Sequence, residues 1–209
     1  MLRNEVLEII QYRLGDHSEM AARALVEMPL LQSVTLEGNS WLPWFLEVDS
    51  VGLACTAGTP AVTLPEDFLA EMEEGHLWIL IDGKRKRLVK QDFDTAQAKY
   101  QETGQPLLYS LGATEITLFP TPDQDYDLDF KYYGKAAPMH LTNIETPWLQ
   151  HAADLVIALL CEILAGTHMQ NPQLAQGFKQ AGVDAWNRLY AKHVARSEVN
   201  QSRTMGGNT

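Results

Sequence analysis

The hydrophobic pattern changes its period twice along this chain of 209 residues. Residues 4–13 and 19–28 carry apolar side chains at the three- and four-residue spacing of amphipathic helices. Between residues 50 and 135 the apolar runs are short and are separated by Gly, Pro and an Asp-Gly pair, which predicts strands and turns. Helical spacing then returns. This order predicts an α+β fold: helices from residues 1–48 and 143–199 form a bundle, and residues 50–135 form an inserted antiparallel β module.

Local signals predict where the first two helices end. Gly15 terminates the first helix, and Asp16 or Ser18 can cap the second. Pro29 removes one hydrogen bond from the second helix, so we expect a kinked helix that continues to about Gly38.

Two further helices are predicted near the C-terminus. Thr146-Pro147 and Asn171-Pro172 each combine an N-cap residue with proline at the first helical position. The first of these helices is apolar nearly all round, which predicts burial, and should end at Gly166. The second should reach about residue 198, with one apolar stripe: Leu174, Phe178, Ala181, Ala185 and Leu189. We expect a single domain over residues 1–200 and a flexible tail over 201–209.

An acidic segment, DQDYDLD, has a spacing that suggests a calcium loop. Its aspartates are Asp123, Asp125, Asp127 and Asp129. A calcium-binding EF-hand starting at Asp123 needs Gly at position six and Glu at position twelve, where this chain has Leu128 and Gly134. Apolar residues alternate with the aspartates, as in a half-buried strand. We therefore predict a hairpin of strands 114–119 and 125–133 with a solvated acidic face, rather than a metal site.

The bulk composition restricts the partners of the chain. The formal net charge is −11 and the isoelectric point is near 4.9, which argues against stable DNA or RNA binding. Cys55 and Cys161 are far apart and lie in no metal-binding pattern, so we expect reduced thiols, no zinc and no disulfide. No run of 18 apolar residues and no signal peptide occurs. We expect a soluble protein, made in the cytoplasm, without membrane contact or cofactor.

Standard catalytic signatures are absent, and two groups of titratable residues are the remaining candidates for an enzyme. His151 and Asp154 lie three apart on one predicted helix, a spacing that is common on helix surfaces. The second group lies near His76 and consists of Glu71, Glu73 and Glu74. We interpret it as a solvated loop. A small cytoplasmic hydrolase or binding protein that uses either group is the alternative to a structural protein.

A basic run and the tryptophans complete the candidate residues. Lys84-Arg85-Lys86-Arg87 follows an Asp-Gly turn and should lie on an edge strand, where charge discourages aggregation; direct phosphate contact is the alternative. We expect the tryptophans to pack in the core or at a subunit interface: Trp41, Trp44, Trp78, Trp148 and Trp186.

Five segments, taken in order and spacing, resemble the head-tail adaptor (connector or neck) proteins of tailed bacteriophages. They are LPWFLEVD (42–49), GTPAVTLPEDFL (58–69), KRKRLVKQDFD (84–94), GQPLLYSLGATEITLFPTPDQDYDLDFKYYGKAAPM (104–139) and TPWLQHAADLVIALLCEIL (146–164). The resemblance covers about residues 1–195, and residues 104–139 are its strongest part. In its layout of helices around a β module, the chain is also remotely similar to tail tubular protein A of short-tailed phages.

The resemblance implies a structural virion protein, not an enzyme. It implies a ring, usually of twelve copies, that lies beneath the portal, joins the capsid vertex to the next neck or tail protein, and lets DNA pass without stable binding. Portal docking would fall to the end of the last helix and the tail, including Arg203, Thr204 and Met205. The residues nearest the DNA would be Lys84, Arg85, Lys86 and Arg87. A neck stopper or a tail-completion protein is the alternative within the virion.

Overall fold

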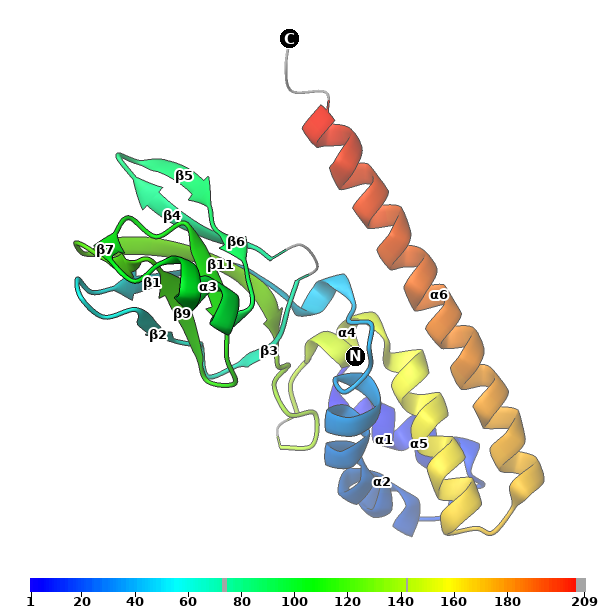
Figure 1. The fold of residues 1–209 in the computed structure, drawn as a ribbon. Coiled ribbons are helices and arrows are strands. Elements are labelled where there is room, and N and C mark those ends of the chain that lie inside the picture. Colours follow the sequence, from blue (N-terminus) through cyan, green and yellow to red (C-terminus); the bar gives the residue numbers. More distant parts are fainter. Residues whose placement is uncertain (73–74, 142, 206–209) are drawn as a thin grey trace. The chain divides into compact units, whose positions relative to one another are not determined.

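The computed structural model describes residues 1–72, 75–141 and 143–205. Backbone contacts divide the chain into two compact units (Figure 1). Met1–Leu46 and Ala136–Thr209 form one, which we call the helical unit, and Glu47–Lys135 form the β unit. The α+β class, with a β module between the helical ends of the chain, is confirmed. No helix among the described residues is both long and apolar enough to cross a membrane.

The helical unit is layered around one central helix. Its elements are α1 (Arg3–Arg13), α2 (Glu19–Leu30), the π-helix η1 (Leu31–Leu36), the 3₁₀ turn η2 (Trp44–Leu46), α4 (Pro147–His151), α5 (Ala153–Thr167) and α6 (Pro172–Met205). α5 packs against α1 and α2 and also against α6 (Figure 1). Because α5 has neighbours on opposite sides, it is buried nearly all round, as the sequence predicts.

Small residues on both helices lie where α5 and α6 pack against each other. A Cβ atom added at Gly182 of α6 would lie 3.3 Å from the Leu159 Cδ2 atom and 3.9 Å from the Ala158 Cβ atom. Gly166 of α5 faces Ala175 of α6 in the same way. The contact stripe of α6 therefore includes Gly182, whereas Ala181, which the sequence analysis placed in the stripe, is exposed.

The second helix continues past Pro29, as predicted, by widening into η1. The Glu37 amide donates to the Gln32 carbonyl at 2.9 Å, a bond five residues back along the chain. A Cβ atom at Gly38 would lie 2.5 Å from the Val34 carbonyl oxygen, so only glycine fits where the chain leaves η1. The predicted start is wrong in detail, because Ser18 occupies the N-cap position without a side-chain hydrogen bond.

The helices after residue 143 differ from the prediction in three places. The Thr146 hydroxyl accepts from the Leu149 amide at 3.5 Å and the Asn171 side chain from the Leu174 amide at 3.0 Å, which confirms both caps. The predicted single helix is broken at Ala152, whose φ of −141° and ψ of 31° are not helical, and α5 continues to Thr167, one residue past the predicted end. α6 extends to Met205 rather than to about residue 198, so residues 201–205 are helical.

The β unit contains two main sheets. One has the order β1 (Glu47–Cys55), β11 (Tyr126–Gly134), β4 (Leu77–Ile81) and β5 (Lys84–Arg87), and β3 (Phe68–Glu71) also pairs with β11. The other has the order β2 (Ala61–Thr63), β9 (Glu115–Phe119), β8 (Leu108–Leu111) and β6 (Val89–Lys90). A short pair joins β10 (Thr121–Pro122) to β7 (Thr103–Gly104). The ladders are antiparallel except for β6–β8 and β7–β10, which are parallel.

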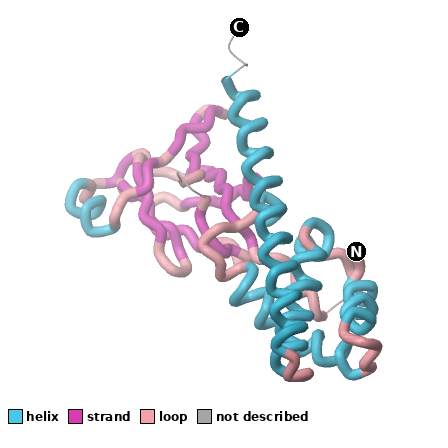
Figure 2. Tube along the Cα trace, turned by 90° about the vertical axis from the view of Figure 1, so that its right-hand side faces the viewer, coloured by secondary structure: helices cyan, strands magenta, loops and turns pink. Residues whose placement is uncertain are grey.

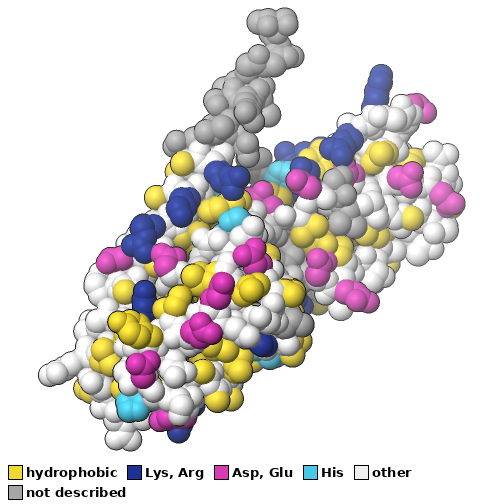
Figure 3. Space-filling model, turned by 180° about the vertical axis from the view of Figure 1, so that it is seen from behind, with side chains coloured by type: hydrophobic (Ala, Val, Ile, Leu, Met, Phe, Trp, Pro, Cys, Tyr) yellow, Lys and Arg dark blue, Asp and Glu magenta, His cyan; other side chains and the backbone are white. Residues whose placement is uncertain are grey.

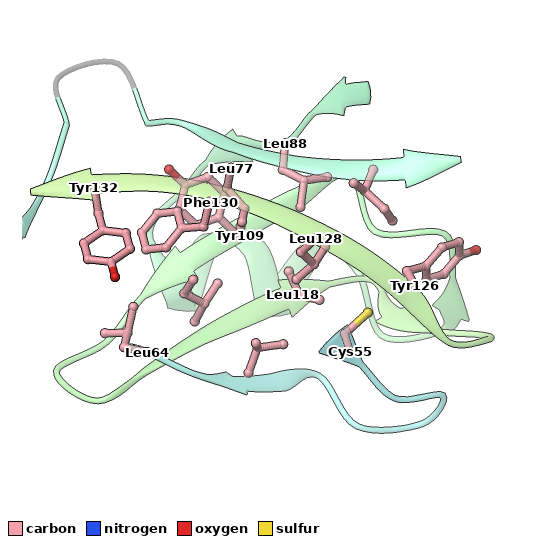
Figure 4. Packing of buried hydrophobic residues seen from close by; sticks show 13 residues of the cluster. Cys55, Leu64, Leu77, Leu88, Tyr109, Leu118, Tyr126, Leu128, Phe130 and Tyr132 are labelled. Atoms are coloured by element: carbon pink, nitrogen blue, oxygen red, sulfur yellow. The ribbon is translucent and has the colours of Figure 1, made fainter. Parts of the chain in front are cut away.

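The apolar core of the β unit is shared between its two main sheets. Figure 4 shows Leu77, Leu128 and Phe130 of the first sheet in one cluster with Tyr109 and Leu118 of the second. The alternation of DQDYDLDF places its aromatic and aliphatic side chains in this core, as predicted.

The predicted hairpin of strands 114–119 and 125–133 is wrong. Both strands form, but β9 pairs with β2 and β8 while β11 pairs with β1, β3 and β4. Pro120 and Pro122 lack an N–H group, so the chain after β9 cannot donate a regular ladder back to it. The segment instead crosses from one sheet to the other.

The β unit also contains one short helix, α3 (Phe93–Lys99), whose N-cap Asp92 accepts a hydrogen bond from the Thr95 amide at 3.2 Å.

Candidate assembly surfaces

His151 and Asp154, the first group considered for catalysis, do not pair with each other. Asp154 binds Arg188 of α6 at 2.6 Å, and the His151 ring stacks on Phe45 with centroids 5.1 Å apart. The break at Ala152 places His151 and Asp154 on different helices. The predicted imidazole–carboxylate pair is therefore replaced by two contacts that hold the helical unit together.

Glu71 connects neighbouring strands of the β unit. Its carboxylate accepts a hydrogen bond from the Tyr109 hydroxyl and forms an ion pair with Lys90. Desolvation and the hydrogen bond to Glu71 raise the pKa of Tyr109, so this phenol stays protonated. The interpretation of a solvated loop is wrong for Glu71, whose side chain is only 9% exposed; Glu73 and Glu74 lie outside the described residues.

The acidic segment is only partly solvated. Asp123 accepts from the Tyr126 hydroxyl at 2.7 Å, and Asp125 accepts from the Ala57 amide at 2.8 Å. Asp127 is exposed, but Asp129 is 4% exposed and forms an ion pair with Arg85. The prediction of a solvated face is therefore wrong at Asp129. Within residues 1–72, 75–141 and 143–205, no three His, Cys, Asp or Glu side chains gather as a metal site would require.

The four basic residues of β5 divide into two pairs. β5 is an edge strand, as predicted, and follows a tight turn in which Asp82 and Gly83 have φ values of 50° and 71°. Arg85 pairs with Asp129 and lies over the Trp78 ring at 5.9 Å; the Arg87 side chain donates to the Gly75 carbonyl at 3.1 Å.

The lysines of β5 alternate with these arginines and therefore point to the other face of the strand. Lys84 and Lys86 are exposed, and neither side chain has a hydrogen bond or ion pair within the described part of the chain. These two lysines are therefore the charges of β5 that are available for contact with a partner. The sequence did not distinguish them from the arginines, because the distinction depends on Asp129 of a distant strand.

α6 forms a basic edge on an acidic protein. It carries five Lys or Arg residues and two Asp or Glu residues, although the whole chain has a net charge of −11. Figure 3 shows Lys and Arg side chains following one another along this helix. The described and exposed ones are Lys179, Arg188, Lys192 and Arg196.

α6 is also much longer than the helix against which it packs. Its 34 residues span about 51 Å, whereas the 15 residues of α5 span about 22 Å. Figures 1 and 2 show it as one continuous helix. Arg188 pairs with Asp154 near the start of α5, so about half of α6, the part after Arg188, extends past α5. Arg203, Thr204 and Met205 form its last described turn.

Aromatic side chains support the middle of α6. Trp41 makes edge-to-face contacts with Trp186, Tyr190 and His193 at centroid distances of 5.1–5.4 Å. Arg196 lies over the Trp44 ring at 5.0 Å. These tryptophans pack within the helical unit, and Trp148 is completely buried there.

A buried polar network joins the two halves of the helical unit. The Glu37 carboxylate accepts from the side chains of Gln32 (2.8 Å) and Trp148 (3.3 Å) and from the Ala136 amide (3.3 Å). The Gln32 side chain in turn accepts from the Met139 amide at 3.0 Å. These hydrogen bonds connect η1 and Glu37 to residues 136–148, which follow the β unit in the chain. Gln32 and Glu37 were not among the residues predicted from the sequence to be important.

The outer face of α2 and η1 carries an apolar stripe that the sequence analysis also missed. Val26, Leu30 and Val34 are 76%, 62% and 61% exposed and follow one another at four-residue spacing. The helical spacing of residues 19–28 predicts only the buried side of α2, which includes Met20, Ala24 and Met28. The four-residue spacing of Val26, Leu30 and Val34 was the sequence pattern from which the exposed stripe could have been predicted.

An open groove of about 620 Å³ lies on the β unit beside α3. Phe93, Tyr100 and Phe119 contribute aromatic rings to it, and Asp94 is the single carboxylate among the described residues that line it. This lining supplies no acid and base pair. Burial raises the pKa of the Cys161 thiol to about 11, and burial also raises the pKa of Cys55, so neither thiol is an activated nucleophile.

The prominent surfaces of the described residues are thus a projecting basic helix, an apolar helical stripe and an edge strand with free lysines. Such surfaces are typical of proteins that assemble with other proteins. The chain belongs to the SU10 adaptor protein family, whose model matches residues 15–207. This is a family of phage head-tail adaptors, so the predicted resemblance is confirmed. No curated protein matches the chain.

Proposed function

We propose that the protein forms a ring beneath the portal and joins the capsid vertex to the next neck or tail protein. The observation that carries this proposal is the family match over residues 15–207, which includes both the β unit and the whole described length of α6. The match supports a structural, non-enzymatic role in the virion. Twelve copies is the number that we expect, because the resemblance implies it.

α6 is the element best suited to reach the portal. The part of α6 after Arg196 follows the contacts of this helix with Trp41 and Trp44, so it can enter a neighbouring protein without disrupting those contacts. Its positive charge would favour an acidic site on the portal. We assign docking to the end of α6 and the residues after it, including Arg203, Thr204 and Met205.

DNA would pass the ring without stable binding. The net charge of −11 repels phosphates, and a pore lined by repeated copies would multiply that repulsion. Lys84 and Lys86 are free charges of β5, so we propose that they make the transient contacts with passing DNA.

Electron microscopy of the protein mixed with its cognate portal complexes tests the proposal. We expect a ring on the tail-side face of the portal, and deletion of residues 201–209 should reduce attachment at least tenfold. An exposed substitution away from α6, Glu8→Ala, is the control. Undiminished attachment of the deletion variant would refute docking through this segment. A ring seated only on another neck component would favour a stopper or tail-completion protein.

A further inference from the structure

The helical unit has two outer layers that differ in charge. α2 and α6 pack on different sides of α5, as the contacts of Gly182 with Leu159 show for the α6 side. Residues 1–36, which include α1, α2 and η1, carry three Arg and five Asp or Glu residues. α6 carries five Lys or Arg and two Asp or Glu residues. One outer layer is therefore acidic and the opposite layer is basic.

Each outer layer also exposes apolar side chains. Val26, Leu30 and Val34 form the stripe on α2 and η1, and all three are more than 60% exposed. On α6, Val183 is 47% and Tyr190 is 50% exposed, and their seven-residue spacing places them on one side of that helix. Three neighbouring aliphatic groups exposed at regular spacing are unusual for a surface that meets only water.

We propose that these two faces are the ring contact: the Val26, Leu30 and Val34 stripe of one copy packs against the Val183 and Tyr190 side of α6 in the next copy. This inference rests on the proposed ring. Opposite charge on the two layers fits a second copy of this chain better than a partner of one sign. Because the two faces differ, the contact repeats head to tail, which is the arrangement that closes into a ring.

The size of the contact explains when the ring would form. A stable interface buries about 800 Å² per partner, and a stripe of three aliphatic side chains covers less than that. Free copies should therefore remain monomers. Copies held side by side on a portal have a high effective concentration, so the same weak contact becomes sufficient.

Disulfide trapping tests the inference. In the double variant Leu30→Cys/Val183→Cys, an internal disulfide is excluded, because a bridge needs Cα atoms within about 7 Å and the intervening helix α5 is about 10 Å wide. The native Cys55 and Cys161 are buried and should not compete. After oxidation on portal complexes, we expect a ladder of covalent multimers on a denaturing gel. The free protein at the same concentration should remain monomeric.

Two controls make the result specific. Tyr12→Cys/Val183→Cys places the first thiol on α1, off the stripe, at a residue that is at least as exposed as Leu30, and should give no ladder. A mixture of the single variants Leu30→Cys and Val183→Cys should give dimers, whereas each single variant alone should give none.

The outcomes separate the inference from the proposed function. Dimers from Leu30→Cys alone, a disulfide to the portal protein, or no ladder from a variant that micrographs show seated as a ring would overturn the contact and leave the ring intact. Failure of the unmodified protein to form a ring on portals would overturn the proposed function and the contact together.

Discussion

The helical unit and the β unit place their polar groups in different positions. In the helical unit, Gln32 and Glu37 lie inside and bond to backbone and side-chain groups of residues 136–148. In the β unit, the corresponding contacts lie at the rim of an apolar core, where Tyr132 donates to Asp67 at 2.6 Å and Tyr109 to Glu71. The helical unit needs an internal network because it joins two halves of the chain that are separated by the whole β unit.

The two units also differ in the side chains that they leave exposed without a partner. In the β unit, Asp129 of the central strand β11 is already paired with Arg85 of β5. The helical unit leaves an apolar stripe and a basic helix exposed. Groups that are already paired contribute little to new contacts, so the helical unit carries the surfaces that are best suited to other copies and to the portal.

Removal of Phe130 should produce the largest loss of stability. Its side chain is completely buried in the centre of β11 and stacks on Tyr132 at 5.3 Å and on Phe68 at 6.0 Å. We expect Phe130→Ala to lower the free energy of unfolding by about 3–5 kcal/mol, measured by urea denaturation. The control Val89→Ala, at a side chain that is 59% exposed, should change it by less than about 0.5 kcal/mol. Equal effects would show that the β unit does not depend on this apolar core.

Loss of the internal network should cost less but should act on the other unit. Glu37→Ala removes the acceptor of the Trp148 indole, the Gln32 amide and the Ala136 amide. Because these donors become buried without that partner, we expect a loss of about 2–3 kcal/mol. Tryptophan fluorescence during urea unfolding measures it, because four of the five tryptophans lie in the helical unit, and the exposed Glu8→Ala is the control. A change below about 0.5 kcal/mol would contradict a role for the network in joining the two halves.

Arg85 and Lys86 are neighbours on β5 with different expected contributions. Arg85→Ala removes an ion-pair partner of the buried Asp129, but the arginine is itself half exposed, so we expect only about 1–2 kcal/mol. Lys86→Ala should change stability by less than about 0.5 kcal/mol. Urea denaturation at low and high salt checks both values, and salt should reduce the difference between them. An equal loss for Lys86→Ala would show that this lysine is not free for a partner.

The fold class and most elements were predictable because their signals are local. An N-cap and proline at adjacent positions, as at Asn171-Pro172, define a helix start without reference to distant residues. The strands β9 and β11 were also visible in the local alternation. Their partners were not, because strand pairing depends on segments such as β1 that lie about 75 residues away in the chain.

The candidate surfaces were predictable to a smaller extent. The basic run of β5 is plain in the sequence, but the division between Arg85 and Lys86 depends on the burial of Asp129 on another strand. The stripe that includes Leu30 required knowledge of which face of α2 meets α5. A helix with apolar residues on two faces does not reveal from its own sequence which face a neighbour covers.

The smallest predicted effect compares two positions that look equivalent in the sequence. Asn171 and Ser18 both precede a helix, but only the Asn171 side chain accepts a backbone hydrogen bond, from Leu174 at 3.0 Å. We expect Asn171→Ala to lower the free energy of unfolding by about 1 kcal/mol and Ser18→Ala to change it by a few tenths at most. Because the cap fixes the start of α6, hydrogen exchange should also accelerate in its first turn. Equal effects at the two positions would mean that residue type at a helix start, rather than the hydrogen bond that forms there, determines the stability of the helical unit.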